Sequence, residues 1–308
     1  MTRDVRLTLG PLLYNWPTSQ RLEFYGAIAA DTSYDAVVLG EVVCVKRSPF
    51  LSDTILEVAQ MLEMAGKEVI FSTLALPVTP RERAELADVC AMADDGIMVE
   101  ANEAGALYLL DGRPHRVGPY FNIYNAETLR VLAGRGATTV CLPWELDRPA
   151  VEALSQAGTA EGLTIEVPAF GSIPLAISAR CAHARAHGLA KDGCQYVCGQ
   201  DSEGMPVDTI DGQTFLRLNG TQTLSDAVLV LATEIPALVR AGVAALRITP
   251  EGVDMVAVGR IYRALLDGRV DSSVAEAMLR DLLGKRRAAN GYLHGRAGAA
   301  WKTMNATS

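Results

Sequence analysis

The sequence lacks the apolar segments that direct proteins into or across membranes. No apolar run among its 308 residues reaches the roughly 18 residues that a transmembrane helix needs. The start, MTRDVRLTLG, has no apolar core of the kind found in signal peptides. We therefore expect a cytoplasmic protein without a transmembrane segment. In that compartment the six cysteines are expected to be free thiols or metal ligands, and not a disulfide framework.

Positive charge is also in short supply. There are 28 lysines and arginines against 36 acidic residues, which gives a formal net charge of -8. Because a nucleic-acid binder needs a basic face to neutralise phosphates, nucleic acid is not an expected partner. The chain has no Gly-x-Ser-x-Gly, no His-Glu-x-x-His and no phosphate loop ending in Gly-Lys-Ser/Thr. Hydrolase and nucleotide-binding functions therefore lack their usual signatures.

What the sequence does contain is a regular alternation of short β-branched runs with longer stretches of helical period. This pattern is typical of βα units around a parallel sheet. It predicts strands near 5–9, 36–39, 69–72, 96–99, 117–123, 138–142, 163–167 and 244–248, and it predicts helices near 19–30, 53–65, 80–92, 103–110, 126–132, 149–157, 227–241, 255–266 and 273–283. We therefore expect an α/β protein with one (β/α)8 barrel domain over 1–308. Residues 171–220 break the rhythm and are expected to form a cysteine-bearing insertion between strands seven and eight.

Three cysteines gather in the segment RCAHARAHGLAKDGCQYVCGQ, with the spacing Cys181-x12-Cys194-x3-Cys198. A metal that takes four soft ligands needs a fourth thiolate from elsewhere in the chain. Cys44 is the candidate, because it alone of the other cysteines stands in a polar setting at the end of an apolar run, in VVLGEVVCVKR. Thiolates select zinc or iron–sulfur clusters, and this spacing does not choose between a [4Fe-4S] cube and an all-cysteine zinc site.

The remaining histidines and cysteines offer one alternative site. His183 and His187 are four residues apart and could share a helical face. A mixed zinc site is therefore possible, with the ligands Cys181, His183, Cys194 and Cys198. Cys90 lies on the apolar face of an expected helix and Cys141 inside an apolar strand, so both are expected to be core thiols.

Polar residues stand at the expected strand ends, where barrels carry their function. They are Glu41, Cys44, Thr73, Glu100, Asn102, Asn122, Asn125, Trp144, Glu145, Glu166 and Arg247. Topology brings these positions toward one face. Glu41 and Glu166 are candidate substrate-binding residues.

The segment EVPAFGSIPLAISARC, residues 166–181, resembles a degenerate form of the signature of the collagenase-like peptidase family. That signature runs Glu-x-Phe, a Gly, a Cys and then Gly-x-Cys. Glu166, Gly171 and Cys181 match it. Further stretches in the family's order are LGEVVCVKR at 39–47, STLAL at 72–76, NIYNAETL at 122–129, LPWEL at 142–146, LNGTQTLS at 218–225, LRITPEG at 246–252 and NGY at 290–292. The resemblance thus covers nearly the whole chain.

The resemblance implies a barrel that carries a [4Fe-4S] cluster on four cysteines, which correspond here to Cys44, Cys181, Cys194 and Cys198. It also implies oxygen-independent hydroxylation of the ubiquinone precursor ring, performed with a homologous second subunit and a lipid-carrier accessory protein. Prephenate is the oxygen donor associated with such reactions. The alternatives are hydroxylation of RNA bases, as in relatives, and a non-catalytic zinc or iron–sulfur partner protein. Departures from the family pattern at Pro168, Pro174, Ala179 and 247–249 predict that the chain is not a protease.

Two arginines flank the expected cluster ligands. Cys44 is followed by Val45, Lys46 and Arg47, and Arg180 precedes Cys181. These cations could balance the charge of four thiolates. Alternatively, Arg47 or Arg180 makes a bidentate contact with a carboxylate of a prephenate-like donor, a geometry that lysine cannot copy.

Overall fold

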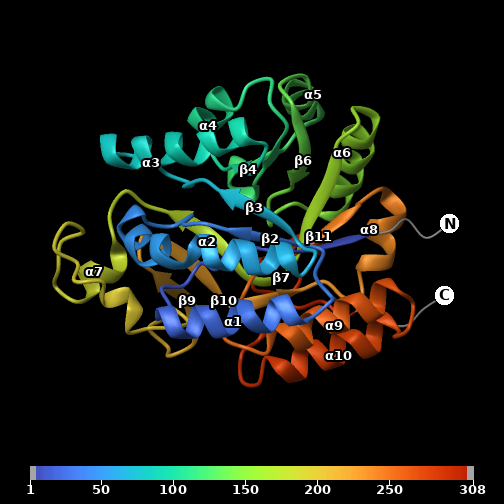
Figure 1. The fold of residues 1–308 in the computed structure, drawn as a ribbon. Coiled ribbons are helices and arrows are strands. Elements are labelled where there is room, and N and C mark those ends of the chain that lie inside the picture. Colours follow the sequence, from blue (N-terminus) through green and yellow to red (C-terminus); the bar gives the residue numbers. More distant parts are fainter. Residues whose placement is uncertain (1–4, 304–308) are drawn as a thin grey trace.

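The computed structural model describes residues 5–303, without the side chain of residue 53. Eight parallel strands close into a barrel, because the last strand pairs with both the first and the seventh. Helices surround it (Figure 1). The barrel strands are β1 (Arg6–Leu9), β2 (Ala36–Leu39), β3 (Glu68–Ser72), β4 (Met98–Ala101), β5 (His115–Val117), β6 (Ala137–Cys141), β7 (Thr164–Ile177) and β11 (Ala245–Ile248). The prediction of a (β/α)8 barrel is confirmed.

The helices α3, α4, α5, α6 and α9 begin at a residue whose side chain accepts from a free N–H group of the first turn. At α3 the Thr79 hydroxyl accepts from the Glu82 N–H at 3.2 Å, and the Glu82 carboxylate accepts from the Thr79 N–H at 2.8 Å, which is a capping box. The helices are α1 (Thr18–Ala30), α2 (Ser48–Met64), α3 (Pro80–Ala91), α4 (Ala104–Leu109), α5 (Ala126–Gly134), α6 (Arg148–Ala160), α8 (Ile235–Ala241), α9 (Met255–Leu266) and α10 (Ser272–Leu282). None of the helices in the described part of the chain is long and apolar enough to cross a membrane.

The core lies between the barrel wall and the helix layer. All four residues of β2 are buried, as expected for a parallel strand that is covered on both faces. One cluster of buried apolar side chains reaches from Leu7 and Leu9 of β1 to Tyr262 and Leu265 of α9.

β7 is much longer than the strand expected at 163–167. It pairs in parallel with β11 as far as Phe170, and from Phe170 onward it pairs antiparallel with β10 (Gln222–Val230). β10 pairs with β9 (Thr214–Asn219), and β9 pairs with β8 (Met205–Asp208). This small antiparallel sheet and α7 (Ala182–Ala186) come between β7 and β11 in the chain, and α7 is outermost on the left of Figure 1.

The expected helix at 227–241 is wrong in its first part. Residues 227–230 belong to β10, and the helix α8 begins only at Ile235, with Pro236 in its first turn. Residues 227–230 form a strand and not a helix because this buried apolar run has hydrogen-bond partners on both sides, in β7 and in β12 (Ala288–Ala289).

Candidate functional site

Four cysteines from three separate segments line one narrow cavity. Cys44 follows β2, Cys181 caps α7, and Cys194 and Cys198 lie in the loop after α7. Lys46, Arg47 and Lys191 line the same cavity. The structure therefore brings together the four cysteines that the sequence singled out, and it places Cys90 and Cys141 elsewhere, at 1% and 0% exposure. All six are free thiols.

The loop that presents Cys194 and Cys198 has an unusual backbone. Gln195 and Tyr196 have φ angles of 48° and 55°, in the left-handed region. For non-glycine residues this conformation costs on the order of 1–2 kcal/mol each, so the surrounding structure has to hold it. The ring of Tyr196 packs edge-on against Phe50 with centroids 4.7 Å apart, which anchors the loop to α2.

Two donors already point at the sulfur atoms. The Ala184 N–H donates to Cys181 Sγ at 3.3 Å, and Asn15 Nδ2 donates to Cys198 Sγ at 3.7 Å. Donors of this kind stabilise thiolates and fix ligand orientation around a metal. Burial, and next to it the charge of Glu41, raises the pKa of Cys44 to about 11. Without a metal this thiol is therefore protonated at neutral pH, and a bound cation would be needed to make it a ligand.

The four thiols could hold either of two groups. A tetrahedral zinc ion with bonds of roughly 2.3 Å holds its sulfur ligands about 3.8 Å apart, whereas a cubane cluster binds each thiolate through a different iron. Among the described residues, no three cysteine sulfurs lie within 4.8 Å of one another. The chemistry of the donor set therefore fits both an all-cysteine zinc ion and a [4Fe-4S] cluster.

His183 does not line this cavity. Its Nδ1 lies 3.1 Å from the Leu218 carbonyl oxygen and its Nε2 lies 2.9 Å from an oxygen of Asp201. The His187 ring stacks on it with centroids 5.5 Å apart. The ligand atoms of His183, His187 and Asp201 come within 4.8 Å of one another. The structure thus places His183 with a histidine and an aspartate, and not with the cysteines of the mixed zinc site.

Arg47 lies against the cysteine cavity and is 2% exposed. Its two terminal nitrogens donate to the Leu13 carbonyl and to Asn219 Oδ1, both at 2.8 Å, while Nε has no partner. Burial acts to lower the pKa of Arg47, but Glu41 and the thiols of Cys198 and Cys44 raise it above its ordinary value. The structure therefore holds a fixed positive charge beside the cysteines.

A larger cavity of about 940 Å³ adjoins the cysteine site, and Cys181 lines both. Its cations are Lys46, Arg81, Arg180, Arg185 and Lys191. We call it the basic cavity. Lys191 pairs with Glu82 at 3.2 Å, but within the part of the chain that the structure describes Arg81, Arg180 and Arg185 have no ion-pair partner. The sequence analysis identified Arg180 and missed Arg81 and Arg185. Arg81 comes from a distant segment, and Arg185, although it lies in the cysteine-bearing segment, belongs to no motif.

Glu41 and Glu166 occupy different environments. The Glu41 carboxylate accepts from the N–H groups of Val43 and Cys44 at 2.8 and 2.9 Å, and burial raises its pKa. Glu166 is fully buried inside the barrel and is paired with Arg116 and Arg247, each at 2.7 Å. Burial alone would raise the pKa of Glu166, but the two arginines lower it to about 2. Glu41 thus holds the backbone at Cys44, whereas Glu166 belongs to an ionic network in the barrel interior.

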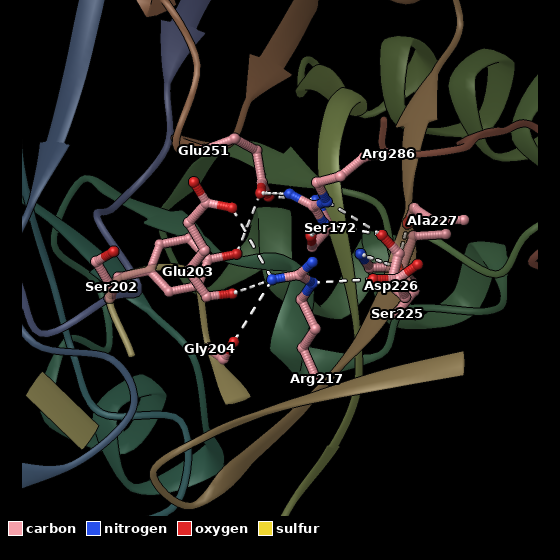
Figure 2. A network of polar contacts seen from close by, with 12 residues as sticks. Ser172, Ser202, Glu203, Gly204, Arg217, Ser225, Asp226, Ala227, Glu251 and Arg286 are labelled. Atoms are coloured by element: carbon pink, nitrogen blue, oxygen red, sulfur yellow. Dashed lines mark hydrogen bonds and ion pairs between the residues drawn. The ribbon is translucent and has the colours of Figure 1, made fainter. Parts of the chain in front are cut away.

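A second polar network ties the inserted sheet to the barrel (Figure 2). Arg286 pairs with Glu251 after β11 and donates to the Ser172 hydroxyl at 2.7 Å and to the Asp226 carbonyl at 2.9 Å. Arg217 of β9 pairs with the Asp226 carboxylate at 3.0 Å. These contacts fix the sheet that follows the cysteine loop.

The barrel mouth holds a further cavity of about 440 Å³. Tyr120 and Trp144 form one wall with ring centroids 5.4 Å apart, and Asn122 and Glu145 line it as well. Gln222 of β10 donates to the Tyr120 hydroxyl at 3.0 Å. The strand-end residues Asn122, Trp144 and Glu145 therefore meet here, apart from the cysteines.

Comparison with known proteins identifies a family whose model matches most of this chain. A family model described as Peptidase family U32 matches residues 25–303. Among solved structures, the carboxyl transferase domain of Rhizobium etli pyruvate carboxylase aligns with a TM-score of 0.49 and 12% identity, over 96% of this chain and 51% of that chain. The tryptophan synthase complex from Pyrococcus furiosus aligns with a TM-score of 0.42 and 14% identity, over 92% of this chain and 100% of that chain. This chain spans about half the length of the carboxyl transferase chain. Similarities this weak imply no shared activity.

Proposed function

This chain belongs to peptidase family U32, and we propose that within the family it is an iron–sulfur protein of oxygen-independent ring hydroxylation in ubiquinone biosynthesis. The observation that carries the proposal is the meeting of Cys44, Cys181, Cys194 and Cys198 at one cavity. The buried guanidinium of Arg47 beside them offsets the negative charge of four thiolates, and the family resemblance favours a cluster over zinc. The motifs of the sequence resemble those of the ubiquinone biosynthesis protein UbiV, and this resemblance supports the proposal of a UbiU-like homologous subunit and a lipid-carrier protein as partners.

In this proposal the residues around the cysteine cavity and the basic cavity have different roles. The four thiolates would hold the cluster, which supplies one-electron chemistry when bound. Arg47 balances their negative charge, and Glu41 holds the backbone of Cys44 in place. Arg180 and Arg185 of the basic cavity bind the carboxylates of a prephenate-like donor, because their guanidinium groups are exposed and have no ion-pair partner among the described residues.

The test of the cluster is anaerobic purification of the whole chain. We expect broad absorption near about 400 nm and roughly four iron and four sulfide per chain. Changing Cys44, Cys181, Cys194 or Cys198 singly to Ser should remove the absorption, because each loses one of four ligands. Cys90→Ser and Cys141→Ser are matched controls and should keep it. Stoichiometric zinc without iron in the anaerobic protein would contradict the assignment.

A further inference from the structure

An apolar cleft of about 540 Å³ separates two neighbouring helices of the barrel. α2 packs on α1 and α3 packs on α4, while α2 and α3 pack less closely on each other. Ile55 of α2 forms one wall of the cleft, and Leu86 and Val89 of α3 form the other. A ring of barrel helices ordinarily buries such faces against each other, so this gap is a cavity of ligand size in the helix layer.

The cleft reaches the barrel wall and the cysteine site. Phe71 of β3 lies at its inner end together with Glu41. The Glu41 carboxylate accepts a hydrogen bond from the Cys44 N–H at 2.9 Å. A molecule that fills the cleft would therefore contact Glu41, which is hydrogen-bonded to the backbone of Cys44 in the cysteine cavity.

Besides Glu41 at the barrel wall, the charged groups that line the cleft are Glu85 and Arg81 of α3. Ser48 donates to the Glu85 carboxylate across the opening, from α2 to α3. Arg81 lines both the cleft and the basic cavity. An apolar space and a cationic space thus meet at Arg81. This arrangement complements a molecule with an apolar chain and an anionic head.

We propose that this cleft binds the apolar chain of an amphiphilic ligand whose anionic head lies at Arg81, in the basic cavity. Only the identity of this apolar chain rests on the proposed function, in which it is the isoprenoid tail of the ring substrate. Binding of the apolar chain in the cleft requires neither a cluster nor a second subunit. Its affinity should rise by about fourfold for each methylene group that is fully buried, until the cleft is filled.

The first experiment titrates the full-length protein with cis-parinaric acid, an 18-carbon acid that fluoresces in apolar surroundings. We expect saturable binding of the acid. Val89→Trp and Ile55→Trp, which fill the cleft from opposite walls, should each weaken binding at least tenfold with an unchanged circular dichroism spectrum. Val131→Trp is the matched control, because Val131 of α5 is 57% exposed on the surface, and it should bind within twofold of the original protein. Two folded cleft variants with unchanged affinity, or an equal loss in the control, would overturn the proposal.

The second experiment tests the head group by displacing the probe with dodecanoate or with dodecanol. Arg81→Ala should weaken dodecanoate about tenfold and dodecanol less than twofold, since only the former carries a charge. Equal effects on both would overturn the placement of the head. Anaerobically purified protein that holds no iron but binds the probe would count against the cluster and not against the cleft. Protein that holds the cluster but does not bind the probe would count against the cleft and not against the cluster.

Discussion

At the residue scale, Arg47 and Arg180 both lie near the cysteines, but their surroundings give them different roles. Arg47 is enclosed, with two of its nitrogens bonded to Leu13 and Asn219. Arg180 is exposed at the basic cavity. Adjacency in sequence suggested the same two alternatives for each residue, and only the contacts of the folded chain separate a structural cation from one available to a donor.

The first prediction compares Arg47→Lys with Arg180→Lys. Lysine cannot donate to both Leu13 and Asn219 in the geometry of a guanidinium group, so Arg47→Lys should lower iron content at least severalfold. Arg180→Lys should keep the iron and raise the KM for a dicarboxylate donor, on the order of tenfold. Iron analysis and donor-dependent hydroxylation are measured on the same preparations. Normal iron content in Arg47→Lys would contradict the role given to Arg47.

The buried carboxylate of Glu166 leads to a prediction about pH. Its pKa is lowered from 4.5 to about 2 by Arg247 and Arg116, although burial opposes the shift. A carboxylate with a depressed pKa in the folded state stabilises the protein above pH 4.5, and this contribution is lost as the pH falls toward 2. Over that window the free energy of unfolding should fall by about 3 kcal/mol from this group.

Glu166→Gln should remove that pH dependence and lower stability near neutral pH by about 3 kcal/mol, because Arg116 and part of Arg247 are left unpaired. Urea unfolding at about pH 7 and at several pH values between about 5 and 2 measures both effects. Glu127→Gln is the control, because the side chain of Glu127 on α5 is 75% exposed. It should change the free energy of unfolding and its pH dependence little. An unaltered pH slope in Glu166→Gln would show that the network does not depress this pKa.

The meeting of Cys44, Cys181, Cys194 and Cys198 at one cavity was predictable from the sequence, because thiols are few and the other two could be set aside as core residues. Burial of Cys90 and Cys141 agrees with that reasoning. Arg81 and Arg185 were not predictable, since single arginines on helices are usually solvated. Their convergence depends on how α3 and α7 are placed around the basic cavity.

At the scale of elements, β7 carries the transition from the barrel to the inserted sheet. Gly171 stands where its partner changes from β11 to β10, with φ at +117°. A Cβ added there would lie 2.6 Å from the Cβ of Thr249. Both the backbone conformation and the close approach therefore require glycine at this position. The sequence did not reveal the transition, because a strand that continues into a second sheet keeps the same apolar pattern.

Gly171→Ala should consequently lower the free energy of unfolding by about 2–4 kcal/mol, the sum of backbone strain and overpacking. Gly188→Ala is a matched control, because Gly188 also has a positive φ of +71° but nothing within 4 Å of an added Cβ. It should cost about 1 kcal/mol. The urea midpoints of the two variants give the comparison. Equal losses would mean that the contact with Thr249 relaxes at no cost.

At the scale of the whole molecule, the barrel could be predicted because eight βα units impose one architecture. The helix expected at 227–241 failed for a tertiary reason, since residues 227–230 find strand partners in β7 and β12 that no local pattern encodes. The cavities around the cysteines are likewise products of the fold. They join loops after β2, β3 and β7 that are far apart in the chain.

The last prediction concerns assembly. In the proposed function the chain works with a homologous U32 subunit, so co-expression of the two should give a stable 1:1 complex. Large apolar side chains on the helix layer offer surface for such contacts, among them Leu56 and Met64 of α2, at 62% and 90% exposure, and Tyr108 of α4, at 77%. Light scattering during size-exclusion chromatography gives the mass of the complex, with each subunit alone at the same concentration as the control. Because a partner that binds only the folded chain stabilises it by mass action, the unfolding temperature should also rise with partner concentration. Separate monomer peaks at micromolar concentration, with no change in unfolding temperature, would refute the heterodimer while leaving the cysteine site untouched.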